Sequence, residues 1–533
     1  MRKIIVLALV GLLSFTLIGC DLFGGATTTT TEQTTAGQTT TNQTTVEQTT
    51  VEETTTEAMT TGGTTTGTTT TGDTTTGETT TVVTTTEVTT NQTTTDVVDF
   101  CDENPFDPSC ISQDNIVLSY ADWGDDELNQ ALIASFMEKY PNITVELRQD
   151  ITGAGAEFTG NLINAQAAGI LPDVFAIDNV PTGINNGMLM DVSEFFDIDP
   201  DTQLIYPNIR DTAVYNGLRL AIPSFQFIKG IYINITLFDT YNIPLPYYDW
   251  DYDEFMEIAI EIRQTGLNDS VFGIDPWYGD LDFEATFPTQ DFADVGYQTW
   301  DGTQFNFSSQ AWIDAYNTKL NLRAQDVVGN YTPEELAALG TDWPWYDGLI
   351  GMKIDGSWNL GLVDSMWDDN NIEVGFWPYP GGDAGQFPPT ILDYACVSSQ
   401  TDYPLEAYLL AKWMTFGKEG WLTRLDLMDE RGDLYLDRYP IADYPEVWAA
   451  AENYTFYIEG LQESIDLLEY SKPDVDKWLP GYKSFWEWVG NDENDYWNRI
   501  GDGLVTPEVF ALEWETKLNQ LVQDALSEIG QDD

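Results

Sequence analysis

Aromatic and acidic residues follow several apolar, strand-like runs of this 533-residue sequence. Trp123 comes just after the run at 116–120, and Asp178 and Asn179 follow the run at 174–177. Residues of the same types follow later runs, at Asp275, Trp277 and Trp358. Flat aromatic rings pack against the C–H faces of a polyhydroxylated solute, while carboxylates and amides accept its hydroxyl protons. These residues are therefore predicted to line a sugar-binding site at strand ends.

The candidates also have structural interpretations. Trp123 could pack in a core, but the acidic and glycine residues around it favour a position at the rim of a site. Asp178 and Asn179 could cap a helix or form a turn. Trp277 could pack inside its own half of the fold. For each of these residues, the sequence excludes neither the structural role nor the ligand-binding role.

The composition excludes several kinds of chemistry. The chain has 21 lysine and arginine residues against 88 aspartate and glutamate residues, a formal net charge of −67, and no histidine. Without histidine, Ser-His-Asp and Cys-His catalysis and His-ligated zinc or iron centres are excluded. The negative charge argues against a nucleic-acid partner, whose phosphates need basic side chains, and it repels an anionic membrane surface.

A metal-like pattern of alternating acids occurs at 197–201. The segment lacks the glycine and the terminal glutamate of an EF-hand loop, so a solvated acidic loop is the preferred interpretation. We expect no metal site and no cofactor.

The elements that position the candidates lie between residues 112 and 533. Strand-like and helix-like segments alternate, at 116–120, 125–140, 143–147, 158–168, 173–177, 230–234, 252–265 and 271–274. The first five follow a βαβαβ order, which predicts an α/β fold with a mainly parallel sheet covered by helices. A segment of this length is too long for one sheet around one core, so we expect two lobes.

Several short motifs resemble the extracellular solute-binding proteins of ABC importers, in particular the maltose-binding-like family 1. They occur in order, at Asp122-Trp123, 136–141 (FMEKYP), 169–175 (GILPDVF), 186–192 (NGMLMDV), 220–223 (LAIP), 230–234 (GIYIN) and 348–358 (GLIGMKIDGSW). Together the resemblance covers most of residues 115–525. The last motif departs from the family pattern, because the expected Gly-Lys reads Ile350-Gly351-Met352.

The resemblance implies a type II periplasmic-binding-protein fold, with two discontinuous α/β lobes around a ligand cleft. The expected N-terminal lobe comprises 112–226 with about 392–440, and the C-terminal lobe comprises 227–391 with about 441–533. The chain is expected to cross between the lobes near 224–229, 378–394 and 435–445.

The resemblance also assigns roles to individual residues. Asp178 falls where similar proteins place a sugar-binding carboxylate, and Asp275 and Trp277 match an acidic-Pro-aromatic segment that touches the ligand. Trp358 matches a sugar-stacking tryptophan, and Gly356 would let the chain approach the ligand closely. A further aromatic residue is expected near the C-terminus, either Tyr482 or Trp486, although this helical segment could be mostly core.

The first 111 residues are expected to lie outside the fold. Residues 1–19 have the basic, apolar and small-residue pattern of a signal peptide, and the small residues before Cys20 resemble a bacterial lipobox, which implies acylation of Cys20. Residues 20–111 contain a Thr-rich tether that cannot bury enough apolar area to fold. Cys101 and Cys110 end this segment, and a local disulfide between them is plausible outside the cytosol.

The resulting hypothesis is a non-enzymatic, monomeric, lipid-anchored component of an ABC importer on the extracellular side of the cell membrane. It would capture a carbohydrate, expected to be an oligosaccharide, by hinge closure and deliver it to the permease subunits. Alternatives are a cell-surface glycoside hydrolase, an adhesin on a stalk, or a binder of a cationic solute.

Overall fold

The structure is a computed structural model that describes residues 101, 104–276, 283–491 and 493–529. The signal-peptide and lipidation predictions, and Trp277, lie outside the described residues. The strands are β1 (Ile116–Ala121), β2 (Ile143–Leu147), β3 (Val174–Ile177), β4 (Val214–Tyr215), β5 (Leu218–Arg219), β6 (Ile222–Asn234), β7 (Phe272–Ile274), β8 (Ile350–Gly356), β9 (Val374–Trp377), β10 (Pro389–Val397) and β11 (Lys472–Pro473). No helix within the described ranges is long and apolar enough to cross a membrane.

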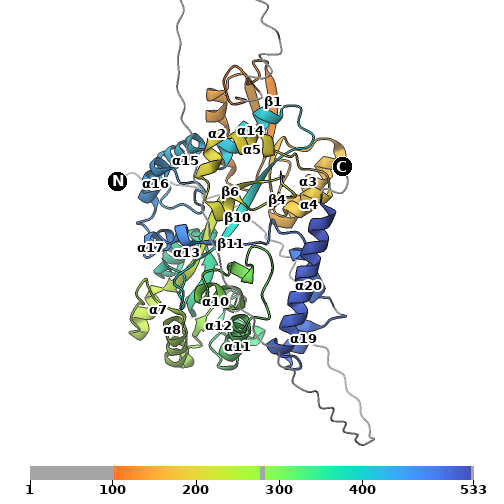
Figure 1. Ribbon diagram of the computed structural model, residues 1–533. Coiled ribbons are helices and arrows are strands. Elements are labelled where there is room, and N and C mark those ends of the chain that lie inside the picture. Colours follow the sequence, from red (N-terminus) through yellow and green to blue (C-terminus); the bar gives the residue numbers. More distant parts are fainter. Residues whose placement is uncertain (1–100, 102–103, 277–282, 492, 530–533) are drawn as a thin grey trace, which may run out of the picture. The chain divides into compact units, whose positions relative to one another are not determined.

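The helices follow and connect these strands (Figure 1). The α-helices are α2 (Asp126–Lys139), α3 (Gly155–Ala168), α4 (Val180–Asn185), α5 (Ser193–Ile198), α6 (Pro207–Arg210), α7 (Ile235–Tyr241), α8 (Tyr252–Thr265), α10 (Phe283–Asp291), α11 (Gln310–Ala324), α12 (Pro333–Leu339), α13 (Gly361–Asn370), α14 (Pro404–Met414), α15 (Lys418–Arg431), α16 (Pro445–Ala451), α17 (Leu461–Ile465), α18 (Tyr482–Val489), α19 (Tyr496–Gly501) and α20 (Pro507–Glu528). A short 3₁₀ helix, η4 (Ser357–Asn359), follows β8.

The first part of the sheet forms as the sequence predicts. β1 pairs in parallel with β2 and β3, and α2 and α3 connect these strands. The helix α2 is amphipathic, since Leu128, Leu132 and Phe136 lie on one face and are buried. Asp125 caps its N-terminus by accepting the backbone N–H groups of Glu127 and Leu128.

The strand β6 joins two parts of the sheet. Its residues 222–228 pair with β10, whereas residues 229–234 lie between β8 and β9. All 13 residues of β6 are buried, including the polar residues Ser224, Gln226, Lys229 and Asn234. Figure 1 shows β6 and β10 running together through the middle of the folded part.

The prediction of a mainly parallel sheet is wrong in this central region. β10 runs antiparallel to both β3 and β6, and β6 runs antiparallel to β8 and β9. The βαβ pattern holds where a helix connects successive strands, at β1–β3. The antiparallel pairs join segments far apart in the chain, which a local pattern does not reveal.

The buried apolar residues form three clusters. The first surrounds β1–β3 and β10 and includes residues of α2, α14, α15 and α16, while the second surrounds β7 and β8 with α7 and α8. The third is rich in aromatic residues and lies among α11, α18 and α20. Its aromatic members are Phe305, Phe307, Trp312, Tyr316, Tyr482, Phe485, Tyr496, Phe510 and Trp514.

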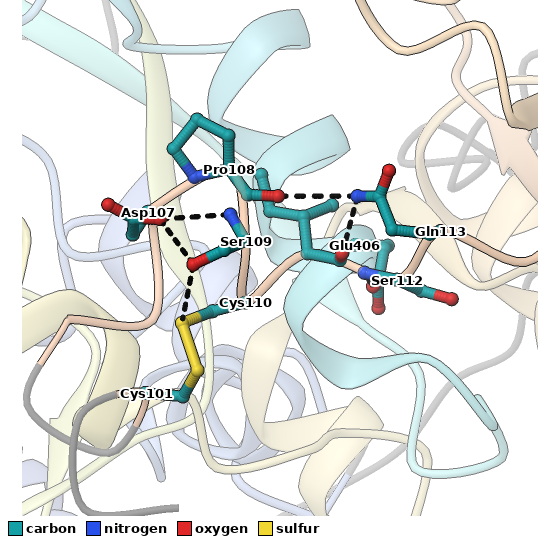
Figure 2. Close-up of a disulfide and its surroundings, with 9 residues drawn as sticks. Cys101, Asp107, Pro108, Ser109, Cys110, Ser112, Gln113 and Glu406 are labelled. Carbon is teal, nitrogen blue, oxygen red and sulfur yellow. Dashed lines mark hydrogen bonds between the residues drawn. A yellow bond between two sulfur atoms is a disulfide. The ribbon is translucent and has the colours of Figure 1, made fainter. Parts of the chain in front are cut away.

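The folded part begins with a small cross-linked loop. Cys101 and Cys110 form a disulfide, the pairing that the sequence left open (Figure 2). Within the loop, Asp107 accepts hydrogen bonds from the N–H and hydroxyl of Ser109 at 2.9 and 2.6 Å. Beyond it, the backbone N–H of Ser112 donates to Glu406 at the start of α14 at 2.8 Å. These contacts fasten the beginning of the fold to the first core.

Candidate ligand-binding site

Two predicted site residues lie together where β1 and β3 end. These strands are parallel neighbours, so Trp123 and Asp178 follow the same edge of the sheet. The ring of Trp123 is half-buried and meets Phe158 edge-on, with the ring centroids 5.2 Å apart. Lys477 Nζ lies 5.9 Å from the centroid of Trp123 and forms an ion pair with Asp393 of β10. Burial opposes the charge of Lys477, but Asp393 and other nearby acids, including Asp178, outweigh it and raise its pKa.

Asn179 has a structural task. Its Oδ1 accepts the N–H and the hydroxyl of Thr182 at 3.0 and 2.9 Å, which caps α4. Its Nδ2 donates to the carbonyl of Asp476 at 3.4 Å. The side chain is 8% exposed. Asn179 therefore fixes the position of α4 and of the segment at 474–478.

Asp275 lies beside the charged side chains of β8. It follows β7, is 5% exposed, and has Lys353 Nζ at 3.5 Å. Lys353 also pairs with Asp355 at 3.1 Å. β7 and β8 are parallel neighbours, so these groups meet near the same sheet edge.

Trp358 lies directly after β8, in η4. Its ring is half-buried and meets Phe227 of β6 edge-on at a centroid distance of 5.9 Å. A Cβ added to Gly356 would lie 2.1 Å from Cζ3 of Trp358. The glycine therefore makes room for the indole, which any larger residue would displace.

A cavity of about 500 Å³ lies beside Trp358. It is lined by parts of α2, α13, α15 and the segment between α15 and residue 438. The lining side chains that matter for ligand chemistry are Asp125, Asn129, Trp358, Asp364, Arg424, Arg431, Asp433, Tyr435, Asp437 and Arg438. Two aromatic side chains, acids and bases thus surround one space large enough for sugar rings.

Tyr482 and Trp486 lie in the aromatic third core. Tyr482 is 7% exposed and stacks on Phe305 with centroids 5.6 Å apart, while Trp486 meets Trp514 edge-on at 5.7 Å. Burial and the nearby carboxylate of Asp476 raise the pKa of Tyr482 well above its usual value. Neither residue lines the cavity beside Trp358.

Sequence reasoning missed the arginines that line this cavity, which are Arg424 and Arg431 of α15 and Arg438 of the predicted crossing at 435–445. Arg424 is 5% exposed, and Arg438 pairs with Asp437 at 3.2 Å. Burial and the neighbouring Arg438 lower the pKa of Arg424 to about 10. In a chain with only 21 basic residues, three arginines within 15 residues, at 424, 431 and 438, are a signal that could have indicated the cavity.

The acids at 197–201 are held by a lysine. Lys412 Nζ lies 2.8 Å from carboxylate oxygens of both Asp199 and Asp201. Asp199 also caps the 3₁₀ helix that begins at Pro200. The segment is thus an ion-paired turn in this structure.

Comparison with known proteins identifies the family. The family model for bacterial extracellular solute-binding proteins matches residues 121–417, so this chain belongs to that family. An uncharacterized ABC transporter extracellular-binding protein from Pyrococcus horikoshii is 23% identical over 301 residues. That match covers 55% of this chain and 65% of the relative, so it spans less than two thirds of the relative's length.

Solved structures share the fold. They include an ABC substrate-binding protein from Listeria monocytogenes in complex with cycloalternan (TM-score 0.55, 19% identity, 76% of this chain and 99% of that one). A cyclic alpha-maltosyl-1,6-maltose binding protein from Arthrobacter globiformis gives a TM-score of 0.58 at 15% identity, over 76% and 99% of the two chains. The sugar-binding protein MalE from Xanthomonas citri gives 0.56 at 14% identity, over 78% and 100%. The expected type II periplasmic-binding-protein fold is thereby confirmed.

Proposed function

We propose that this protein is the lipid-anchored, extracellular solute-binding component of an ABC importer and that its ligand is a carbohydrate. The ligand would be held beside Trp358 and released unchanged to a membrane permease. The observation that carries the proposal is the cavity of about 500 Å³ in which Trp358 lies among carboxylates and guanidinium groups. An indole face suits the apolar side of a sugar ring, and the charged groups suit its hydroxyls.

Family membership supports this proposal, as do the sugars named for similar structures, which include cycloalternan and a cyclic maltosyl-maltose. The second group at the ends of β1 and β3, Trp123 with Asp178, would contact the same ligand after closure. Closure would take place about the strands β6 and β10 and the segment near 435–445. The proposed lobes are 112–226 with about 392–440, and 227–391 with about 441–533.

Cys20 is proposed as the acylated residue, and the Thr-rich segment that follows it as a tether. Tethering keeps the binding part near the permease and raises its effective concentration there. Two acyl chains are sufficient for stable anchoring.

The test is a thermal-unfolding screen of the purified protein with mono- and oligosaccharides. Binding to the folded state raises Tm with ligand concentration, and a ligand at about 100 times its Kd stabilises by about 2.7 kcal/mol. The expected result is a rise in Tm with one class of saccharide and no change in the saccharide itself. Hydrolysis products would show a glycoside hydrolase instead, and no shift with any saccharide would refute the carbohydrate assignment.

A further inference from the structure

One buried guanidinium beside Trp358 lacks the partners that its environment demands. Arg424 is 5% exposed, and within the described part of the chain it makes one hydrogen bond, from Nη2 to the carbonyl of Met414 at 3.3 Å. No carboxylate among those residues lies within ion-pair distance of it. Its guanidinium carbon lies 5.0 Å from the centroid of Phe225, a cation–π contact that offers no acceptor oxygen. Several N–H groups of Arg424 therefore remain for a group in the cavity.

The other basic groups of the cavity are already paired. Arg431 contacts Asp125 and Asp433, both at 2.6 Å, and Arg438 contacts both oxygens of Asp437 at 3.2 Å. The chain carries 88 acidic residues, so a shortage of acids does not explain why no carboxylate lies within ion-pair distance of Arg424 among the described residues. An incompletely paired buried charge costs free energy, which a ligand of opposite charge would recover.

A second unpartnered donor lines the same cavity. Asn129 of α2 is 3% exposed, and its Nδ2 has no hydrogen-bond partner among the described residues. A Cβ on Gly124 would lie 3.5 Å from both Asn129 Nδ2 and Arg438 Nη1, so these two donors converge. Asp122 also lies beside Gly124, since its Oδ2 would be 3.2 Å from that Cβ, and this oxygen already accepts a hydrogen bond from the hydroxyl of Tyr120.

We infer that this cavity recognises the carboxylate of a uronic acid unit, so that the ligand is an acidic oligosaccharide. The inference rests on the proposed carbohydrate-binding function and specifies its substrate class. A carboxylate offers two coplanar oxygens, which match the fork of a guanidinium group and leave acceptor capacity for the amide of Asn129. The rings of Trp358 and Tyr435 line the same space and would receive the sugar ring that carries the carboxylate.

The pairing of individual charges, and not the net charge of the cavity, favours an acidic ligand over a neutral one. Four acids (Asp125, Asp364, Asp433 and Asp437) and three arginines line the cavity, and among the described residues Arg424 is the arginine of this set that has no carboxylate within ion-pair distance. A net charge of −67 repels anions from most of the surface, so a site for an anion needs a local donor set. Three of the 21 basic residues line this one cavity. Sugar hydroxyls can accept from Arg424, but they leave its charge uncompensated.

The test compares acidic oligosaccharides with their carboxyl-reduced counterparts. The probes are short oligomers of galacturonate, glucuronate, mannuronate and guluronate, and the same oligomers after reduction of each carboxyl group to a primary alcohol. Binding to the full-length protein is measured by calorimetry. We expect at least one acidic oligomer to bind at least tenfold more tightly than its reduced form, with an affinity that falls as salt is raised.

Two variants connect this preference to the cavity. Asn129→Asp keeps the size of the side chain but places a carboxylate beside the ligand oxyanion, and we expect it to weaken binding of the acidic oligomer at least tenfold. Arg424→Lys keeps the charge but removes the fork, and a similar loss is expected. Asn321→Asp on α11, away from the cavity lining, adds the same charge and serves as the control. Circular dichroism and Tm confirm that each variant is folded.

The outcomes separate the two proposals. Equal binding of acidic and reduced oligomers, or unchanged binding by a folded Asn129→Asp variant, would overturn the uronic acid assignment and leave carbohydrate binding intact. Binding of neither set, together with no response in the wider saccharide screen, would overturn both.

Discussion

The indole of Trp358 is positioned by its neighbours at the wall of the cavity. It meets Phe227 edge-on, lies against the space that Gly356 leaves open, and lines the cavity. Because the ring is only half-buried, removing it takes little from the core while taking the flat surface from the site.

We therefore expect Trp358→Ala to lower the affinity for the saccharide at least tenfold and to leave the fold intact. Burial of a large apolar side chain contributes about 1.5–3 kcal/mol, and about 1.4 kcal/mol corresponds to a tenfold change in affinity. The matched control is Trp367→Ala on α13, since Trp367 is 54% exposed and does not line the cavity. Wild-type affinity in a folded Trp358→Ala variant would show that the site is elsewhere.

Asp474 is a buried carboxyl near the group formed by Trp123, Asp178, Asp393 and Lys477. It is 1% exposed, and its Oδ1 accepts the backbone N–H of Leu392 at 2.8 Å. Burial, with a further contribution from Asp476, raises its pKa to about 7, although Lys477 and the hydrogen bond from Leu392 act in the opposite direction. The folded protein thus holds this proton more tightly than the unfolded chain does.

The raised pKa of Asp474 predicts a pH-dependent stability. An unfolded aspartate has a pKa of about 4. The contribution of protonated Asp474 to the free energy of unfolding is therefore fully present below about pH 4 and is lost as the pH rises through about 7. Asp474→Asn should therefore raise Tm more at pH 8 than at pH 5, in thermal-unfolding measurements. The exposed substitution Asp239→Asn controls for the change in net charge. An equal effect of Asp474→Asn at both pH values would contradict the assignment.

At the scale of elements, the end of β8 shows how a strand positions a site residue. Gly356 is the last residue of β8, and its carbonyl accepts the hydroxyl of Tyr232 at 2.9 Å. This contact and the pairing with β6 fix the backbone, so an added side chain at Gly356 must displace the indole rather than the strand.

We expect Gly356→Ala to lower the free energy of unfolding by about 1–3 kcal/mol, as overpacking does, and to weaken ligand binding through the displaced Trp358. The control is Gly160→Ala in α3, where an added Cβ meets nothing within 4 Å. That substitution should stabilise the protein by about 0.5–1 kcal/mol, because alanine loses less conformational entropy in a helix. Chemical denaturation and calorimetry measure both effects. A Gly356→Ala variant as stable and as tight-binding as wild type would contradict the clash.

Elements set by neighbouring residues could be predicted from the sequence, whereas pairings between distant segments could not. The helix expected at 252–265 has the observed bounds of α8, since Asp251 caps it and its apolar residues recur on one face. The pairing of β10 with β3 and β6 could not be predicted, because it joins segments separated by long stretches of chain. The same holds for the cavity, which α2, α13 and α15 line only after the sheet has brought them together.

At the scale of the whole molecule, the proposal predicts a division between anchoring and binding. Cys20→Ser should move the protein from the membrane fraction to the soluble fraction and leave saccharide affinity unchanged, because the acyl chains and the cavity are separate features. Fractionation with immunoblotting and calorimetry test the two parts. If the Cys20→Ser variant stayed in the membrane fraction, the lipid-anchor proposal would be contradicted, and the binding proposal would not be affected.

The sequence by itself determined the fold class, the family resemblance and the first βαβαβ unit. These follow from hydrophobic periodicity, caps and glycine positions, which act over a few residues. Only the tertiary structure decided that Asn179 caps α4, that Tyr482 packs in an aromatic core, and that Arg424 and Asn129 face one cavity with donors unused. Burial and the pairing of charges depend on contacts between distant segments, and those contacts exist only once the chain has folded.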